Sequence, residues 1–303
     1  MKLGMVGLGK MGANMTTRLI EGGHEVVVTD LNLNAVKSAE SSGAIASTGL
    51  KDLVSKLEAP RIVWVMVPSG GPTETTVTTL GDMVEAGDII IDGGNSNYKD
   101  TMRRGETLKE KGIHYVDVGT SGGVWGLKEG YSMMIGGEEE PVKFLTPLFQ
   151  TFAPAADKGW GHVGPSGAGH FVKMIHNGIE YGMMQAFAEG FAIMKKKEEF
   201  DLDLAEVSRT WLHGSVVRSW LLDLIHDALK DDQQLEDIAA FVPDSGEGRW
   251  TVFEAIDLNV SAPVITTALQ ERIRSRDENS YTDKLLSVMR NQFGGHAIKK
   301  SGD

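Results

Sequence analysis

The sequence contains no cysteine among its 303 residues. Disulfide bonds, thiolate metal sites and cysteine nucleophiles are therefore excluded, which fits a reducing compartment. The sequence also lacks any apolar run near the roughly 20 residues that a membrane-spanning helix needs, and its first residues enter a strand pattern without signal-peptide organisation. We therefore expect a cytoplasmic protein with no membrane attachment.

Positive charge is also scarce. Lys and Arg number 30 against 42 Asp and Glu, which gives a formal net charge of -12. Such a surface argues against general nucleic-acid binding, because phosphate contacts require a basic surface. Screening limits the global field to about 8 Å at physiological salt, so a pocket that gathers a few cations can still bind a small anionic substrate.

The first 163 residues alternate short apolar runs with segments of helix length. This rhythm predicts an α/β fold with a doubly wound, mostly parallel Rossmann-type sheet, and most of the chain from residue 164 to 303 reads as helix. A long helix is expected over residues 168–197. The expected strands are residues 2–6, 25–29, 62–67, 89–92 and 114–118, extended by 132–135 and 156–160.

A glycine-rich turn directly follows the first expected strand. Gly7, Gly9 and Gly12 match the dinucleotide-binding pattern, in which they permit a tight turn, close approach of the pyrophosphate and close packing of the helix. Met11 lies inside the same turn. The free N–H groups at the start of the following helix favour phosphate binding, so we expect Gly7, Gly9, Met11 and Gly12 to contact the cofactor.

Asp30 ends the second expected strand and bears on the choice of cofactor. A carboxylate there can accept hydrogen bonds from the ribose hydroxyls and repels a 2′-phosphate, and no arginine follows it closely. We therefore expect NAD, with NADP as the alternative. The competing interpretation is that Asp30 only caps the next helix.

Further loops follow the ends of later strands, where ligands bind in such sheets. Val67 and the loop after it, together with Asn95 in the run 92–96, are expected on the nicotinamide side. The turn Ser121-Gly122-Gly123 can form a nest of N–H groups for a carboxylate.

Within the long expected helix, Lys173 and Glu180 lie seven residues apart. Seven steps of about 100° come within about 20° of two full turns, so both side chains point to one face. They are either a catalytic base and acid or a solvated charge pair. His176 and Asn177 lie between them on the sequence.

The chain resembles the 6-phosphogluconate dehydrogenases, a family within the β-hydroxyacid dehydrogenases. The most specific match is residues 173–181, Lys-Met-Ile-His-Asn-Gly-Ile-Glu-Tyr, which reproduces the catalytic helix of that family almost completely. Supporting matches are the segments 92–96, 121–123, 248–251 and 290–296. The resemblance covers nearly the whole chain and is nearest to the short bacterial subfamily.

The resemblance implies oxidative decarboxylation of 6-phosphogluconate to ribulose 5-phosphate and carbon dioxide, without a metal. It implies that Lys173 is the base and Glu180 the acid. It places Asn95, Ser121, Gly122, Gly123, His176 and Asn177 on the substrate hydroxyls and carboxylate, and Tyr181 and Arg272 at the phosphate. It also implies a homodimer in which Arg290 and His296 complete the site of the neighbouring subunit, so residues 164–303 would bind substrate and form the dimer.

One departure concerns the phosphate end. The family pattern Lys-Gly-Thr-Gly reads here as Ser245-Gly-Glu247-Gly, so a lysine is lost and a carboxylate is gained. Arg249 is the candidate to compensate, and Arg274 and Arg276 compete with Arg272 for the family position.

Three other interpretations stay open. A non-decarboxylating β-hydroxyacid dehydrogenase, acting on a compound such as 3-hydroxyisobutyrate, would have no need for Glu180. A dinucleotide-binding sensor without turnover would need neither Lys173 nor Glu180. A metal site built on His176 and Glu180 would still require a third ligand.

Overall fold

The computed structural model describes residues 1–300, which form two compact units. One unit is Met1–Asn177 and the other begins at Gly178, so the division falls inside helix α9 (Ala168–Lys196). The long helix predicted over residues 168–197 is confirmed. The boundary predicted at residue 163 lies where the last strand ends and only helices follow among the described residues. That this position divides two domains stays a prediction.

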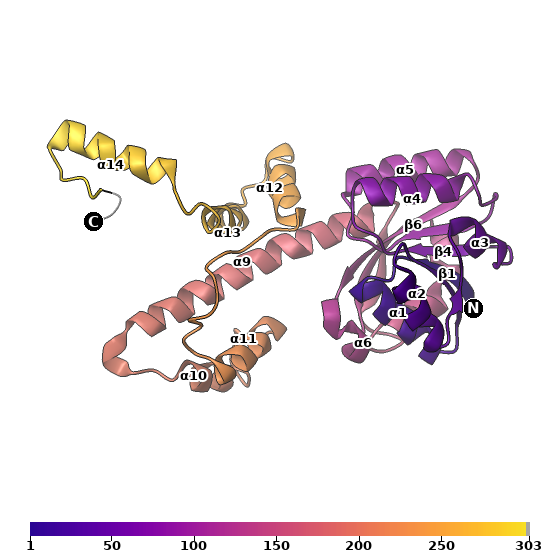
Figure 1. Cartoon of the computed structure of the whole chain (residues 1–303), viewed down its shortest axis with the longest axis horizontal. Helices are drawn as coiled ribbons and strands as arrows, with labels where there is room; N and C mark the ends of the chain where they lie inside the picture. Colours follow the sequence, from indigo (N-terminus) through magenta and orange to yellow (C-terminus); the bar gives the residue numbers. More distant parts are fainter. Residues whose placement is uncertain (301–303) are drawn as a thin grey trace. The chain divides into compact units, whose positions relative to one another are not determined.

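The first unit is built on one eight-stranded sheet (Figure 1). Its spatial order is β3-β2-β1-β4-β5-β6-β7-β8, and every neighbouring pair is parallel except β6 and β7. The predicted doubly wound, mostly parallel sheet is thereby confirmed. The strands are β1 (Lys2–Val6), β2 (Glu25–Thr29), β3 (Ile45–Ala46), β4 (Ile62–Val65), β5 (Ile89–Asp92), β6 (His114–Ser121), β7 (Ser132–Gly136) and β8 (Trp160–Gly164).

The last strand differs from its prediction. Residues 156–160 were expected to be extended, but Ala155 and Lys158 bridge a tight turn and Gly159 has a φ of 80°. Strand β8 therefore begins only at Trp160, where it pairs with Met133 of β7. The two-residue strand β3 was not predicted, because two residues are too few for a periodic pattern.

Helices cover both faces of the sheet because strand side chains alternate between the faces. Leu3, Met5 and Trp64 pack with the first, second and eighth helices. Val27, Val63 and Val65 pack with the third, fourth and fifth. The helices of this unit are α1 (Lys10–Glu21), α2 (Leu33–Ser41), α3 (Leu50–Ser55), α4 (Gly71–Gly81), α5 (Tyr98–Glu110), η1 (Gly123–Trp125), α6 (Gly126–Glu129), α7 (Glu139–Phe144) and α8 (Thr146–Phe152).

The second unit consists of the C-terminal part of α9 and the helices that follow it. Tyr181 packs with Val252 and Leu269, and Phe191 packs with Leu204 and Leu222, so two small apolar clusters hold it together. The helices after α9 are η2 (Glu198–Phe200), α10 (Leu204–Trp211), α11 (Trp220–Asp231), α12 (Glu247–Asp257), α13 (Pro263–Arg274) and α14 (Tyr281–Gly294). None of the helices within residues 1–300 has the length and apolar character to cross a membrane.

An ion-pair network joins α4 to α5 in the first unit. Glu74 accepts hydrogen bonds from Arg103 and Arg104 at 2.7 Å, and the Arg104 side chain is only 3% exposed. The bonds from Arg103, and then those from Arg104, lower the pKa of Glu74 to about 2. Ionised Glu74 is therefore favoured in the folded state.

We predict that Glu74→Gln lowers the free energy of unfolding at pH 7 by about 1 kcal/mol, a value discounted for solvent screening because Glu74 is 37% exposed. A depressed pKa stabilises the fold above the ordinary carboxyl value and loses that effect as pH falls towards about 2. The difference from wild type should therefore shrink between pH 4.5 and pH 2 in urea unfolding curves. Glu85→Gln, which removes a 75% exposed partner of Arg61, is the control. A difference that stays constant with pH contradicts the prediction.

Candidate active site

The turn between β1 and α1 has the geometry that dinucleotide binding requires. Gly7 has a φ of 95°, and its N–H donates to the carbonyl of Thr29 at 2.9 Å. A Cβ at Gly12 would collide with the Gly7 carbonyl, whereas no described atom lies within 4 Å of a Cβ at Gly9. Gly7 and Gly12 are thus needed for the fold itself, and Gly9 leaves open space beside the N-terminus of α1. That space fits a cofactor pyrophosphate.

Asp30 is bound to the same turn. Its carboxylate accepts the N–H of Leu8 at 2.5 Å and the N–H of Asn32 at 2.6 Å. The helix that follows is capped by Asn32, whose side chain accepts from Asn34, so the interpretation of Asp30 as the helix cap is wrong. A carboxylate has about four acceptor positions, and the two that remain fit ribose hydroxyls.

Asn95 is held rigidly beside the end of β6. Its amide donates to the Thr120 carbonyl at 3.3 Å and accepts the Thr120 N–H at 3.1 Å. Behind this loop lies buried Asp92, which accepts from the hydroxyls of Ser96 at 2.9 Å and Tyr115 at 3.0 Å. Burial, followed by the charge of Asp92, raises the pKa of Tyr115 well above its ordinary value, so this hydroxyl stays a donor.

Sequence reasoning missed this support for Asn95. Arg104 of α5 completes it, with Nη1 of Arg104 lying 3.6 Å from the Asp92 carboxylate. The available signal was a charged residue at the end of the apolar run 89–92. Such a residue, buried at the carboxyl end of a parallel strand, needs partners in the fold.

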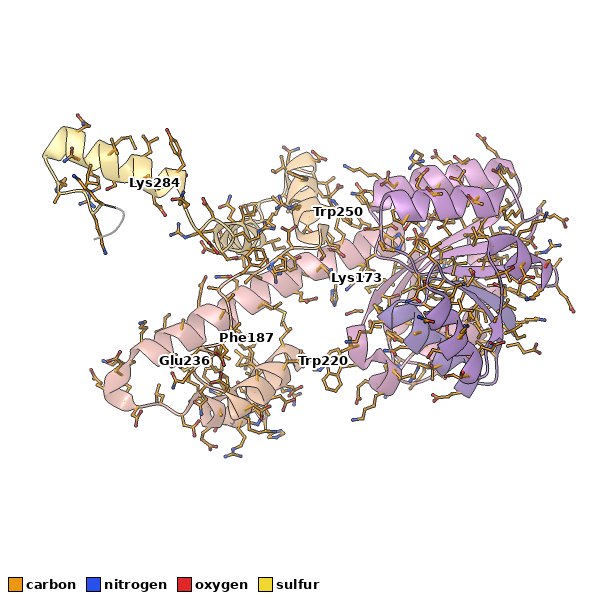
Figure 2. All side chains as sticks on the ribbon, viewed as in Figure 1. Lys173, Phe187, Trp220, Glu236, Trp250 and Lys284 are labelled. Carbon is orange, nitrogen blue, oxygen red and sulfur yellow. The ribbon has the colours of Figure 1, made fainter. Side chains whose placement is uncertain are left out.

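The first turns of α9 gather three polar side chains of the predicted catalytic helix. Lys173 Nζ donates to Asn177 Oδ1 at 2.7 Å and lies 3.3 Å from His176 Nδ1. His176 Nε2 lies 3.5 Å from the Ser121 hydroxyl, so the turn after β6 reaches this group. Lys173 is 4% exposed and Asn177 is 9% exposed. Figure 2 shows Lys173 projecting from α9.

The turn after β6 contains two glycines with positive φ, and its role as a carboxylate nest stays a prediction. Gly122 and Gly123 have φ values of 125° and 50°, which side chains rarely adopt. The approach of His176 to both Ser121 and Lys173 brings these three predicted residues together in the first unit. The Val67 side chain lies beside Gly7, 3.1 Å from the position that a Cβ would take there. Met11 is the second residue of α1.

Glu180 and Tyr181 lie further along α9, in the second unit. Because α9 is continuous from Ala168 to Lys196, Glu180 follows Lys173 by seven helical positions, as predicted. The Tyr181 side chain is 5% exposed. Over the described residues, no three His, Asp or Glu side chains are grouped to hold a metal ion.

Tyr181 is the centre of a polar group within the second unit. The guanidinium carbon of Arg272 lies 3.5 Å from the centroid of the Tyr181 ring, and the Ser245 N–H donates to the Tyr181 hydroxyl at 3.3 Å. The Ser245 hydroxyl donates to the carboxylate of Glu247. Arg272 is therefore the arginine beside Tyr181, whereas Arg274 pairs with Asp283.

Arg249, the candidate to replace the missing lysine, is paired with a carboxylate. It binds Asp244 through two hydrogen bonds of 2.8 and 3.0 Å, and Arg276 also lies 3.1 Å from Asp244. The bond from Arg249, with the charges of both arginines, lowers the pKa of Asp244. The positive charge of Arg249 is thus shared with Asp244, and its compensation for the lost cation stays a prediction.

Arg290 and His296 lie in the C-terminal part of the described chain. Arg290 belongs to α14, and the amide of Asn291 donates to the His296 carbonyl at 2.9 Å. The completion of a neighbouring subunit's site by these two residues stays a prediction.

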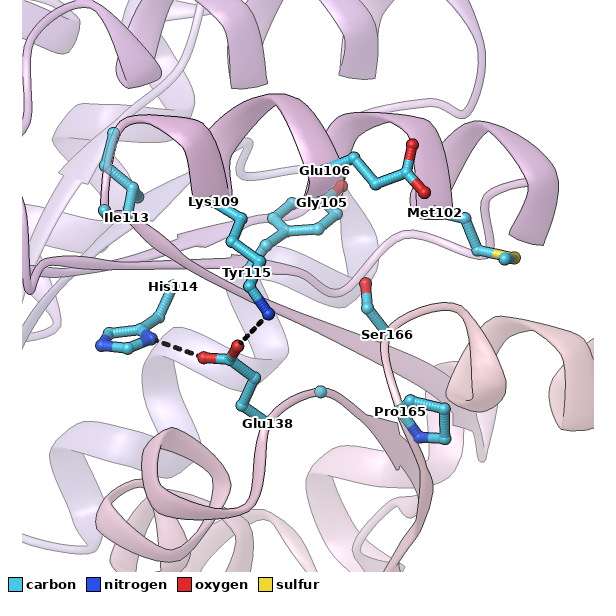
Figure 3. A pocket seen from close by; sticks show the side chains of 12 residues that line it. Met102, Gly105, Glu106, Lys109, Ile113, His114, Tyr115, Glu138, Pro165 and Ser166 are labelled. Atoms are coloured by element: carbon cyan, nitrogen blue, oxygen red, sulfur yellow. Dashed lines mark hydrogen bonds and ion pairs between the residues drawn. The ribbon is translucent and has the colours of Figure 1, made fainter.

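A cavity of about 390 Å³ opens on the first unit between α5, the start of β6 and the segment before α9 (Figure 3). His114, the first residue of β6, lines it together with Lys109 and Glu138. The Glu138 carboxylate binds Lys109 at 2.8 Å and His114 at 3.1 Å, so these charges are mutually satisfied. None of the predicted site residues is among the residues that line this cavity.

Together, the sheet, the glycine turn and the polar start of α9 define a dinucleotide-dependent dehydrogenase class of protein. Residues 2–163 match the model for the NAD binding domain of 6-phosphogluconate dehydrogenase, and residues 169–299 match the model for its C-terminal domain. The chain therefore belongs to the 6-phosphogluconate dehydrogenase family.

Individual relatives agree with this assignment. The Bacillus subtilis protein YqeC, whose name assigns it provisionally to the 6-phosphogluconate dehydrogenases, is 45% identical over 99% of this chain and 100% of its own. A Haloferax volcanii protein named NAD(+)-dependent, decarboxylating 6-phosphogluconate dehydrogenase is 40% identical over 100% of both chains. The solved 6-phosphogluconate dehydrogenase of Plasmodium falciparum is 28% identical with a TM-score of 0.84, covering 100% of this chain and 67% of its own.

The open space at Gly9 gives a direct test of the cofactor site. We predict that Gly9→Ala leaves the free energy of unfolding within about 0.5 kcal/mol of wild type, because the methyl group meets no described atom. It should weaken NAD binding at least about tenfold, because the methyl group occupies the approach of the pyrophosphate. Fluorescence titration with NAD and urea unfolding measure the two effects. Gly161→Ala, at another open glycine, should change neither. Unchanged NAD affinity in Gly9→Ala would refute this placement.

Proposed function

We propose that the protein catalyses the NAD-dependent oxidative decarboxylation of 6-phosphogluconate to ribulose 5-phosphate and carbon dioxide. The observation that carries this proposal is the cluster of buried Lys173 and Asn177 with half-buried His176 near the start of α9, with Glu180 following on the same helix. Family membership and the name of the Haloferax volcanii relative support it.

The residues of the glycine turn fit NAD. Gly7, Gly9, Met11 and Gly12 would hold the pyrophosphate at the start of α1, and Asp30 would accept the ribose hydroxyls. Val67 and Asn95 would border the nicotinamide. Bound NAD supplies the acceptor for the hydride that leaves C3 of the substrate.

Lys173 acts as the base in this proposal. To take the proton from the C3 hydroxyl its amine must be neutral, and burial favours the neutral form of an amine. Asn177 Oδ1, which accepts from Nζ at 2.7 Å, fixes the direction of the amine. The protonated amine then stabilises the charge that develops on the C3 oxygen as carbon dioxide leaves.

Glu180 acts as the acid. Loss of carbon dioxide leaves an enediol, and the enediol carbon that becomes C1 of ribulose 5-phosphate must receive a proton. A carboxyl group on the same face of α9 can supply that proton. A non-decarboxylating dehydrogenase needs no such group. Ser121, Gly122 and Gly123 would bind the substrate carboxylate, while Asn95 and His176 would bind its hydroxyls.

Tyr181 and Arg272 would bind the phosphate end of the substrate. Ser245 and Glu247 lie in the same group as Tyr181 and make it less cationic than the lysine-containing family pattern. Additional positive charge would come from Arg290 and His296 of a second copy in a homodimer. The exposed apolar side chains of α14, including Leu285, Leu286 and Met289, support burial against another chain.

The proposed reaction is tested by incubating the protein with NAD and 6-phosphogluconate. We expect carbon dioxide and NADH in equal amounts. The carbon dioxide is measured by trapping the label released from C1 of 6-phosphogluconate, and the NADH is measured by its absorbance. NADH without carbon dioxide would show a non-decarboxylating dehydrogenase, and NAD binding without turnover would show a sensor. Gluconate, assayed in parallel, should be a much poorer substrate if Tyr181 and Arg272 bind phosphate. Equal use of gluconate would refute that part of the proposal.

The cofactor preference depends on Asp30. We predict that wild type uses NAD at least about tenfold more efficiently than NADP, and that Asp30→Asn narrows the ratio, because the repulsion of the 2′-phosphate is removed. The measurement is kcat/KM for both cofactors. Asp52→Asn, which changes a carboxylate in α3, is the matched control and should leave the ratio unchanged. Preference of the wild type for NADP would contradict the charge argument.

A further inference from the structure

A buried carboxylate holds the start of α9 against the sheet. Asp117 of β6 is fully buried, and its two oxygens accept the N–H of Gly167 at 2.7 Å and the N–H of His170 at 2.9 Å. These N–H groups belong to the beginning of α9, where the helix has no internal acceptors for them. The negative charge also lies at the positive end of the helix dipole.

The backbones around this carboxylate pack so closely that only glycine fits at several positions. Gly136 of β7 is paired with Asp117, and a Cβ at Gly136 would collide with the Asp117 carboxylate. A Cβ at Gly169 would press on backbone atoms of β6 and β7, and a Cβ at Gly119 would collide with the Cβ of Lys173. Helix and sheet therefore meet at the closest distance that backbones allow, and the carboxylate selects one register between them.

A second tether acts on the same turn of the helix. The Thr101 hydroxyl of α5 lies 2.8 Å from His170 Nδ1, and both side chains are buried. His170 thus donates its backbone N–H to β6 and is hydrogen-bonded through its ring to α5. Lys173 follows His170 by three residues, a rise of about 4.5 Å, so any movement of the helix start is passed directly to Lys173.

We propose that Asp117 is a positioning residue for the reaction, which sets the place of the Lys173 amine by fixing the register of α9 on β6, with Thr101 as a second tether. This inference rests on the proposed role of Lys173 as the base. Asp117 touches neither substrate nor cofactor in this account. Its effect is geometric, since a misplacement of about 1 Å at a reacting group can reduce the rate by about 100-fold.

The test compares two buried aspartates of the first unit. Asp117→Asn keeps the size of the side chain but replaces one acceptor oxygen by an amide donor that faces a helix N–H. Asp88→Asn is the matched control, because Asp88 is 1% exposed and accepts the N–H of Arg61 at 2.6 Å and of Glu85 at 2.8 Å, at the opposite end of the sheet. We expect both variants to lose stability, but only Asp117→Asn should alter the position of α9.

For Asp117→Asn we expect kcat to fall about 100-fold, with NAD affinity and the KM for 6-phosphogluconate within about threefold of wild type. For Asp88→Asn, kcat corrected for the folded fraction should stay within about threefold, even with a lower Tm. Equal kcat values in the two variants would overturn the inference. If Asp117→Asn does not fold, Thr101→Val is measured in its place, and we expect its kcat to fall about tenfold. A wild-type kcat in Thr101→Val would equally overturn the inference.

A second readout does not depend on turnover. The rate at which an amine-reactive acylating reagent labels Lys173, followed by peptide mass spectrometry from pH 7 to pH 10, should rise severalfold in Asp117→Asn and stay at the wild-type rate in Asp88→Asn. An unchanged profile in Asp117→Asn would overturn the inference. If wild type fails to turn over 6-phosphogluconate, the proposed function fails, and the labelling profile alone decides whether Asp117 positions Lys173.

Discussion

The contact between the start of α9 and strand β6 is the constraint on which the candidate site depends. Glycines at 119 and 169 remove the side chains that would separate helix and strand, and Lys173 then lies buried beside the end of the sheet. The same strand continues into Ser121, whose hydroxyl approaches His176. A single close packing interaction thus brings the predicted base and the predicted carboxylate turn together.

The sheet supplies the other half of this arrangement. Parallel strands bring their carboxyl ends to one edge, so the turns after β1, β4, β5 and β6 converge although they are far apart in the sequence. Two of these turns are held by carboxylates: half-buried Asp30 holds the glycine turn, and buried Asp92 holds the loop of Asn95. These carboxylates therefore position backbone groups, which preorganises the turns that carry the predicted cofactor residues.

Much of this could be predicted from the sequence. Near-continuous apolar runs located β1, β2 and β5 to the residue, and the seven-residue spacing placed Lys173 and Glu180 on one continuous helix. Local patterns do not show which distant residues become partners, so they predict neither the hydrogen bonds that the start of α9 donates to Asp117 nor the ion pair of Arg104 with Asp92. For the same reason Arg249 was considered as a phosphate ligand, although it pairs with Asp244.

The measurement that tests the central claim most directly is the turnover of Lys173→Met with NAD and 6-phosphogluconate. Methionine keeps the length and apolar stem of the side chain but cannot accept a proton. The account predicts a fall in kcat of at least about 1,000-fold, with NAD affinity within about threefold of wild type. Turnover within about tenfold of wild type would contradict the assignment of Lys173 as the base.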